Sequence, residues 1–256
     1  MGDEAQLTET AAYNRRMWDK ESDEYQKRHG GQLEASGGAA WGVWQIPESE
    51  LQVLGEVGGR DVLEFGCGAA QWSIALHQRG ANVTGLDNSG RQLEHARELM
   101  AEAGVEFPLV HSSAEATPFD DASFDIVFCD HGAMTFGDPY RTVPEASRVL
   151  RPGGLFAFSM HTPIIDMAWG ATDDHPSDRL LEDYWGLHRQ EYPDEPVNFQ
   201  LCYGEWIRVF REGDLEIESL LELRPAEDAT STYREDVDRD WARRWPMEHI
   251  WRVRKR

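Results

Sequence analysis

Short apolar runs alternate with amphipathic stretches through the middle of this chain. The apolar runs predict strands near residues 61–65, 82–87, 105–110, 124–129 and 154–160. The amphipathic stretches predict helices near residues 70–79, 89–103 and 139–150. Strands that alternate with helices in this way are typical of a parallel α/β sheet.

The alternation fails after the fifth predicted strand. Four prolines interrupt residues 162–203, and only one helix, near 178–189, is expected there. Regular pattern then returns as a helix over 204–212, a strand over 215–223, a charged connection over 224–246 and a last strand around Ile250, Trp251 and Val253.

The first 50 residues have a different character. Residues 1–29 are polar with interspersed aromatic residues and predict one or two helices that cover the sheet. Gly30-Gly31 and Gly37-Gly38 predict a flexible link, and Pro47 is expected to open a helix from Glu48 to Glu56. The expected organisation is a helical cover (1–50), a nucleotide-binding core (51–161), a substrate-covering insertion (162–203) and the rest of the sheet (204–256).

The most informative motif lies where the first strand ends. Val62-Leu63-Glu64-Phe65 is followed by Gly66-Cys67-Gly68 and then by a helix. Strand, glycine turn and helix form a nucleotide-binding unit, because glycines let a ligand lie against bare main chain. A second acid, Asp87, ends the next strand about 20 residues later, where a ribose-binding carboxylate is expected.

The neighbours of the turn indicate which nucleotide it binds. Gln71 stands where a dinucleotide fingerprint has a small residue. Glu64 would repel a pyrophosphate at the helix N-terminus but favours a ligand with an ammonium group. S-adenosylmethionine has that ammonium and no phosphate. A nicotinamide oxidoreductase is therefore the weaker alternative.

Three further motifs complete a family pattern. Ser113–Phe119 is similar to an adenine-binding loop, Ser123–Cys129 to a fourth strand, and Glu145–Gly154 to the helix and turn before a fifth strand. With the glycine turn and Asp87, these residues resemble the class I S-adenosylmethionine-dependent methyltransferases over roughly residues 60–160. Ser113 departs from the pattern, because that loop usually opens with an acid.

The resemblance implies a fold and a donor site. The fold is α/β: a doubly wound, Rossmann-like, mostly parallel sheet of seven strands whose last strand is antiparallel, with an N-terminal helical cover and an insertion after strand five. The cofactor is S-adenosylmethionine, and the product is S-adenosylhomocysteine. The expected cofactor-binding residues are Glu64, Gly66, Cys67, Gly68, Asp87, Asn88, Ser113, Ala114, Glu115 and Asp130. For Asp87 the alternative is a helix cap, and Glu115 is alternatively only an exposed residue.

Residues that follow strands four and five are the candidates for catalysis, because ligands of open α/β sheets bind beyond the strands' carboxyl ends. His131 is the first candidate for a general base or substrate contact and His161 the second. The alternative for both is a histidine that only lines the cleft. The candidate substrate-binding residues are Tyr13, Trp18, Trp44, Met134 and Trp169. Ordinary packing is the alternative for each aromatic residue.

Composition limits the partners. The chain has 256 residues and a net charge of −22, which disfavours nucleic acid and anionic membranes. No secretion signal or membrane span is evident, and three scattered cysteines fit a cytoplasmic protein. His175 lies near Asp173, Asp174 and Asp178 at a spacing that matches no zinc pattern, so no metal is expected.

These observations predict methyl transfer to the oxygen, nitrogen or carbon of a small molecule, by a monomer or homodimer. An aromatic or secondary metabolite is an expectation from the aromatic-rich cover. Two alternatives stay open: a protein that binds the donor without catalysis, and a methyltransferase that acts on tRNA or protein.

Overall fold

A seven-stranded sheet forms the centre of the computed structural model, which describes residues 7–170 and 173–256. Residues 1–6 of the predicted cover and 171–172 of the predicted insertion lie outside the described residues. The strands are β3 (Asp61–Phe65), β4 (Asn82–Asp87), β5 (Leu109–His111), β6 (Phe124–Asp130), β7 (Leu150–His161), β10 (Leu215–Leu223) and β11 (Glu248–Lys255).

The order of the strands confirms the predicted doubly wound sheet. It runs β10-β11-β7-β6-β3-β4-β5, with parallel pairing from β7 through β5. β11 is antiparallel to both β7 and β10. The chain order reverses between β3 and β6, so the carboxyl ends of these two strands are where such a sheet holds a ligand.

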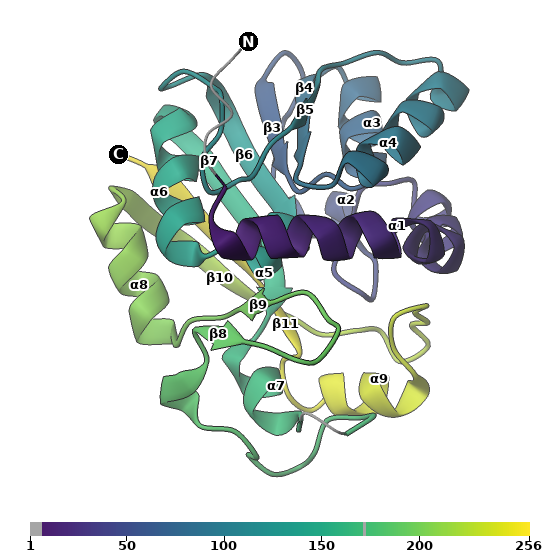
Figure 1. Cartoon of the computed structure of the whole chain (residues 1–256), viewed down its shortest axis with the longest axis vertical. Helices are drawn as coiled ribbons and strands as arrows, with labels where there is room; N and C mark the ends of the chain where they lie inside the picture. Colours follow the sequence, from purple (N-terminus) through teal and green to yellow (C-terminus); the bar gives the residue numbers. More distant parts are fainter. Residues whose placement is uncertain (1–6, 171–172) are drawn as a thin grey trace.

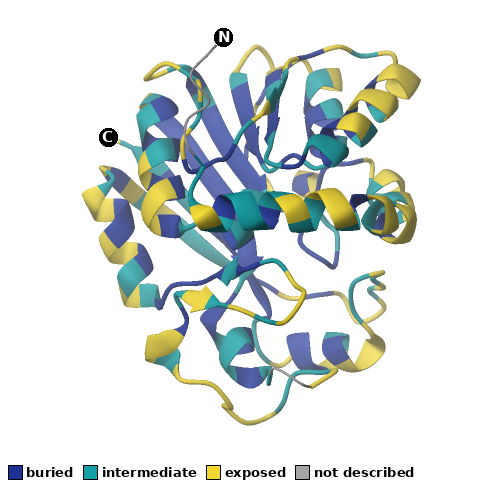
Figure 2. Cartoon of the chain, in the orientation of Figure 1, coloured by how far each residue is buried: buried dark blue, intermediate teal, exposed yellow. Residues whose placement is uncertain are grey.

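Helices pack on both faces of the sheet (Figure 1). They include α3 (Gln71–Gln78) and α4 (Gly90–Ala103) on one face and α6 (Pro139–Val149) and α8 (Tyr203–Glu212) on the other. Successive strand residues supply the two cores: Val62 and Phe128 pack with the first pair of helices, and Leu63 and Val127 with the second pair. This alternation explains the unbroken apolar strands of the sequence, whose ribbons are buried in Figure 2.

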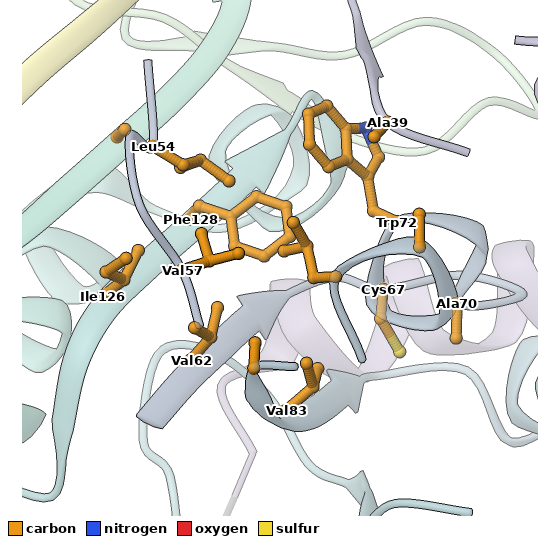
Figure 3. Packing of buried hydrophobic residues seen from close by; sticks show 14 of the residues in the cluster. Ala39, Leu54, Val57, Val62, Cys67, Ala70, Trp72, Val83, Ile126 and Phe128 are labelled. Carbon is orange, nitrogen blue, oxygen red and sulfur yellow. The ribbon is translucent and has the colours of Figure 1, made fainter. Parts of the chain in front are cut away.

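The core beneath the glycine turn is tightly filled (Figure 3). Trp72 from α3 packs against Phe128 from β6 with ring centroids 5.4 Å apart. Cys67 from the turn belongs to the same cluster and is 5% exposed. This packing fixes the position of the glycine turn relative to the sheet.

A single long helix, α1 (Glu9–Ala35), crosses the carboxyl ends of the parallel strands (Figure 1). The predicted flexible link at Gly30-Gly31 is wrong, because both glycines lie inside α1. Each costs such a helix about 1 kcal/mol relative to alanine, which contacts of α1 with α4 and with the loop at Thr232 offset. The helix ends only before Gly37 and Gly38, whose positive φ angles of 72° and 70° terminate it.

Shorter elements complete the cover. They are β1 (Ala40–Trp41), β2 (Ile46–Pro47), α2 (Glu48–Leu51), α5 (Gly132–Phe136), α7 (Pro163–Ala168), the 3₁₀ turn η1 (Tyr184–Gly186), β8 (Arg189–Gln190), β9 (Asn198–Phe199) and α9 (Asp236–Ala242). A third core joins three separate segments of the chain through Val43, Trp44, Ile165, Ala168, Trp241, Ala242 and Met247.

Three element predictions need correction here. The helix predicted over 178–189 is wrong: only η1 forms there, because Leu180 and Trp185 stay 67% and 86% exposed and offer no buried apolar stripe. The helix expected from Glu48 to Glu56 is shorter, because Gln52 adopts a left-handed conformation (φ 50°) and ends α2. The charged connection over 224–246 contains α9.

Candidate active site

A cavity of about 650 Å³ lies at the carboxyl ends of the strands, beneath α1. Its walls come from the glycine turn after β3, the turns after β4 and β6, the end of β7, and a loop that contains Tyr233 and Arg234. Parts of the insertion, Asp194–Pro196 and Asn198, also line it. The cavity therefore brings together segments from every part of the chain.

Gly66 shows why the turn requires glycine. Its φ is +73°, and a Cβ atom there would lie 2.4 Å from the backbone nitrogen of Ala133. The turn after β3 therefore abuts the turn after β6. The N–H groups of Gly66 and Cys67 both donate to the carbonyl of Leu86, at 2.8 and 2.9 Å, which ties the turn to β4 as well.

Glu64 lines the cavity from the end of β3 and is 4% exposed. Its Oε2 accepts hydrogen bonds from the N–H and hydroxyl of Ser73, at 3.0 and 2.5 Å, in the first turn of α3. Burial raises the pKa of Glu64 to about 8. A cationic ammonium beside this carboxyl would favour its charged form, which suits the predicted donor contact.

Asp87 organises the turn from the end of β4. Its Oδ2 accepts from the Gly68 N–H at 2.8 Å, and its Oδ1 accepts from the Ser89 N–H at 2.7 Å. The side chain therefore holds the start of α4, while the cap itself is the Ser89 hydroxyl, which accepts from the Gln92 N–H. Each oxygen of Asp87 keeps a lone pair for a hydroxyl group in the cavity.

Two predicted donor-site residues, Asn88 and Glu115, contact the N-terminal cover. Asn88 accepts from Arg15 Nε at 3.1 Å and donates to the Ala11 carbonyl at 2.8 Å, both in α1. Glu115 is 8% exposed, so the alternative of an exposed residue is wrong. Its two oxygens accept from the Thr8 hydroxyl at 2.6 Å and the Asp138 N–H at 3.0 Å.

Asp130 and the adenine-loop residues complete the predicted set. Asp130 accepts from the Gly42 N–H at 2.9 Å and from the hydroxyl of Ser159. Ser113 accepts from the Glu115 N–H at 3.2 Å, and Ala114 is buried. All ten predicted cofactor-binding residues line the cavity, and their binding roles stay predictions.

His131 follows Asp130 directly, and its ring contacts the first residue of β11. Its backbone is unusual for a non-glycine residue, with φ 59° and ψ −80°. Its Nε2 lies 2.5 Å from Oε1 of Glu248. No hydrogen bond to its Nδ1 is present among the described residues, so this nitrogen is free to meet a ligand in the cavity.

Glu248 acts on His131 from a position that sequence reasoning missed. It is 1% exposed, and its Oε1 also accepts from the Val43 N–H at 2.9 Å. A Cβ atom on Gly42 would lie 2.8 Å from both oxygens of Glu248, so glycine there makes room for the carboxylate. Burial alone would lower the pKa of His131, but the hydrogen bond and charge of Glu248 outweigh burial and raise it.

His161 has a different environment, although its ring centroid lies 5.1 Å from that of His131. Its Nε2 lies 3.5 Å from Nη2 of Arg234, and its Nδ1 lies 3.9 Å from Oδ1 of Asp166. Burial, followed by the charges of His131 and Arg234, lowers the pKa of His161 well below its usual value. His161 is therefore a neutral ring whose Nε2 lone pair faces a guanidinium.

The predicted substrate-binding residues divide into two groups. Trp18 lines the cavity. Trp44 and Met134 are buried in hydrophobic cores, Tyr13 donates its hydroxyl to the Glu195 carbonyl at 3.2 Å, and Trp169 packs against Arg234 outside the lining. Those four do not line this cavity, because packing or the cover takes up their side chains.

Sequence reasoning found Trp18 but missed the rest of an aromatic wall. Trp18 and Tyr25 of α1 lie edge to face at 5.4 Å, and Trp18 meets Phe136 of α5 at 4.9 Å. Tyr233 joins them by a 2.8 Å hydrogen bond between its hydroxyl and that of Tyr25. These four residues line the cavity and present flat apolar surface to its contents. The spacing of Trp18 and Tyr25 on one helix face was a usable signal, whereas nothing local marked Tyr233.

The next two features concern metal binding and membrane spans. Among residues 7–170 and 173–256, no cluster of three or more His, Cys, Asp or Glu side chains is arranged to hold a metal ion. His175 instead lies 3.0 Å from Oδ1 of Asp238. Within the same described residues, no helix combines the length and apolar character needed to cross a bilayer.

Comparison with known proteins agrees with this geometry. Residues 63–158 match the family model described as a methyltransferase domain. A demethylmenaquinone methyltransferase of Listeria monocytogenes is 39% identical over 103 residues, covering 39% of this chain and 44% of that protein. A ubiquinone biosynthesis O-methyltransferase of Azoarcus is 33% identical over 131 residues, covering 45% of this chain and 56% of that protein. The chain thus spans about half the length of these relatives.

Solved structures share the fold over more of the chain. An S-adenosylmethionine-dependent methyltransferase from Mesorhizobium loti superposes with a TM-score of 0.65 at 24% identity, covering 81% of this chain and 96% of that one. The [4+2]-cyclase SpnF has a TM-score of 0.66 at 18% identity and covers 98% of this chain and 97% of its own. Residues 63–158 therefore match a methyltransferase domain, and the chain shares the fold of solved S-adenosylmethionine-dependent methyltransferases.

Proposed function

We propose that this protein transfers the methyl group of S-adenosylmethionine to a hydroxylated, flat small molecule, with His131 as the proton acceptor. The observation that carries the proposal is the His131–Glu248 pair at the cavity edge, beside the glycine turn and Asp130. The two quinone-pathway relatives are named for small-molecule methylation, which supports the same class of acceptor.

The residues at the donor end fit the donor. Eight acids line the cavity, and their field favours a cation over a phosphate: Glu21, Glu24, Glu64, Asp87, Glu115, Asp130, Asp194 and Glu195. Glu64 would meet the ammonium, Asp87 the ribose hydroxyls, and Ser113 and Ala114 the adenine. When bound, the donor supplies an electrophilic methyl group on a sulfonium.

The protein's own residues position the acceptor and take up the proton of its hydroxyl group. Glu248 accepts from His131 Nε2, which fixes the tautomer and leaves the Nδ1 lone pair for the proton of an attacking hydroxyl. The carboxylate also stabilises the imidazolium that forms. The aromatic wall of Trp18, Tyr25, Phe136 and Tyr233 orients a ring between the cover and the donor, and α1 excludes water.

The test is formation of S-adenosylhomocysteine from a methyl-labelled donor in the presence of a panel of phenols, catechols and hydroquinones. The proposal predicts label in at least one acceptor, lost in His131→Ala. Donor binding with no transfer to any member would indicate a binding protein or a different reaction, as the cyclase with the same fold illustrates. Label transferred only to tRNA or protein would contradict the small-molecule class.

A further inference from the structure

Arg234 is a partly buried cation with no ion-pair partner in the described part of the chain. It lines the cavity, and none of the ion pairs among the described residues includes it. Its Nε is buried without a hydrogen-bond partner. Because burying an unpaired charge is costly, a guanidinium in this setting indicates a site completed by an anion.

The surroundings hold the guanidinium in place. Its Nη1 donates to the Tyr233 carbonyl at 3.1 Å, and its central carbon lies 4.8 Å from the ring centroid of Trp169. Its Nη2 faces the neutral Nε2 of His161 at 3.5 Å. These contacts fix the orientation of the planar guanidinium and do not use all of its N–H donors. The remaining donors can form two parallel hydrogen bonds to a carboxylate.

The charges around the cavity restrict where an anion can bind. Acids line the donor end, and Glu248 and Asp238 act on Arg234 only at longer range than an ion pair. Arg28, the other arginine of the lining, is exposed on α1. Of the two arginines in the lining, Arg234 is thus the less exposed one, and a negative group bound beside it gains a charged partner.

We propose that the methyl acceptor carries an anionic group, a carboxylate or an equivalent acid, that Arg234 binds while His131 faces the hydroxyl to be methylated. The proposal rests on the proposed function. The ring centroids of His131 and His161 lie 5.1 Å apart, and Nη2 of Arg234 lies 3.5 Å from Nε2 of His161. One small aromatic acceptor can therefore contact both His131 and Arg234. His161 is the positioning residue, since its lone pair holds Arg234 toward the cavity.

The test uses the full chain saturated with S-adenosylhomocysteine. Benzoate, 4-hydroxybenzoate and 3,4-dihydroxybenzoate are titrated by ligand-observed NMR, each beside its own carboxamide. The expected result is that at least one acid binds roughly tenfold more tightly than its amide, as a charge-assisted hydrogen bond gives. Arg234→Gln removes that preference, Arg234→Lys keeps part of it, and His161→Ala reduces it. Arg244→Gln, which removes an exposed arginine paired with Asp178, leaves it unchanged.

Equal binding of acid and amide, or no binding of either, overturns the proposal. A preference for acids that survives Arg234→Gln overturns it as well. If Arg234→Gln instead weakens the affinity for S-adenosylhomocysteine, the arginine binds the carboxylate of the donor and the assignment to the acceptor is wrong. Failure of the proposed function looks different, because then the unaltered protein either binds no S-adenosylhomocysteine or binds it and transfers label to no acceptor of the panel.

Discussion

The donor end and the acceptor end of the cavity are built in different ways. The donor end consists of Glu64, the glycine turn and Asp87, which lie within 24 residues of sequence and are joined by hydrogen bonds to adjacent backbone. The acceptor end consists of His131, His161, Arg234 and Glu248, which come from four distant segments. The donor end is therefore a local motif, whereas the acceptor end exists only after the sheet has formed.

This difference predicts which substitutions act through the fold and which act through chemistry. At the proposed donor end, the groups expected to contact the ligand also hold the backbone, so we expect changes there to affect stability and binding together. At the acceptor end, the contacts join side chains that the folded backbone has already brought together. Changes there should affect turnover with little effect on the donor.

The largest effect is expected for Gly66→Ala. Strain at its φ of +73° costs about 1–3 kcal/mol, and the added Cβ would collide with Ala133 at 2.4 Å. Donor binding should fall at least a hundredfold or the protein should unfold, as measured by calorimetry and circular dichroism. Gly153→Ala is the matched control, with a φ of +77° and open space around the new atom. Equal effects of the two variants would show that backbone strain alone matters.

His131→Ala should leave donor affinity intact and lower kcat by about 10² or more, the usual contribution of a general base. In Glu248→Gln, loss of the carboxylate lowers the raised pKa of His131. Since the neutral imidazole is the active form, the rise of kcat with pH should move to lower pH, with kcat reduced about tenfold. The measurement is a pH–rate profile for each variant with the acceptor found by the labelled-methyl screen. Profiles that coincide with that of the unaltered protein would remove the general-base role.

Asp87→Ala should weaken the binding of S-adenosylhomocysteine more than tenfold, because it removes a charge-assisted contact to two hydroxyl groups. Thermal stability should also fall, since Gly68 and Ser89 lose their acceptor. Asp19→Ala is the control: this acid accepts from the Ser89 hydroxyl at 2.7 Å but does not line the cavity. Affinities that fall equally in both variants would mean that Asp87 acts only through the fold.

The smallest effect concerns the protonation of Glu64. Its pKa is raised from 4.5 to about 8, so its contribution to stability is complete below pH 4.5 and is lost as the pH rises through about 8. The unliganded protein should therefore lose stability across that range more steeply than Glu64→Gln does, in thermal melts. An ammonium bound beside Glu64 favours the carboxylate, so donor binding at pH 7 should release protons. Calorimetry in buffers of different ionisation enthalpy detects that release, and its absence would argue that Glu64 is already charged.

The difference between local motifs and contacts of distant segments also explains what the sequence could predict. Strand and helix periodicity predicted the sheet, because the central strands are buried between helices, and α3, α4, α6 and α8 each turn apolar residues toward the sheet. The presence of Glu64, Gly66 and Asp87 at the cavity was predictable, because each lies at or next to the carboxyl end of a strand. Gly30 and Gly31 misled the prediction, because tertiary contacts of α1 outweigh their local preference.

The acceptor end was only half predictable. His131 and His161 follow strands and could be expected at the cavity. Glu248 and Arg234 carry no local signal: one occupies a strand position like any other, and the other lies in a charged loop. Their roles depend on the antiparallel pairing that places Glu248 opposite His161, a register that no residue pattern specifies.

The central claim is that the cavity beneath α1 binds the methyl donor through the glycine turn and its flanking acids. Calorimetric titration of S-adenosylhomocysteine into the full chain tests it most directly. One molecule bound per chain, with affinity lost in Gly66→Ala and reduced in Asp87→Ala, is the predicted result. Absence of binding by both S-adenosylhomocysteine and S-adenosylmethionine would contradict the claim.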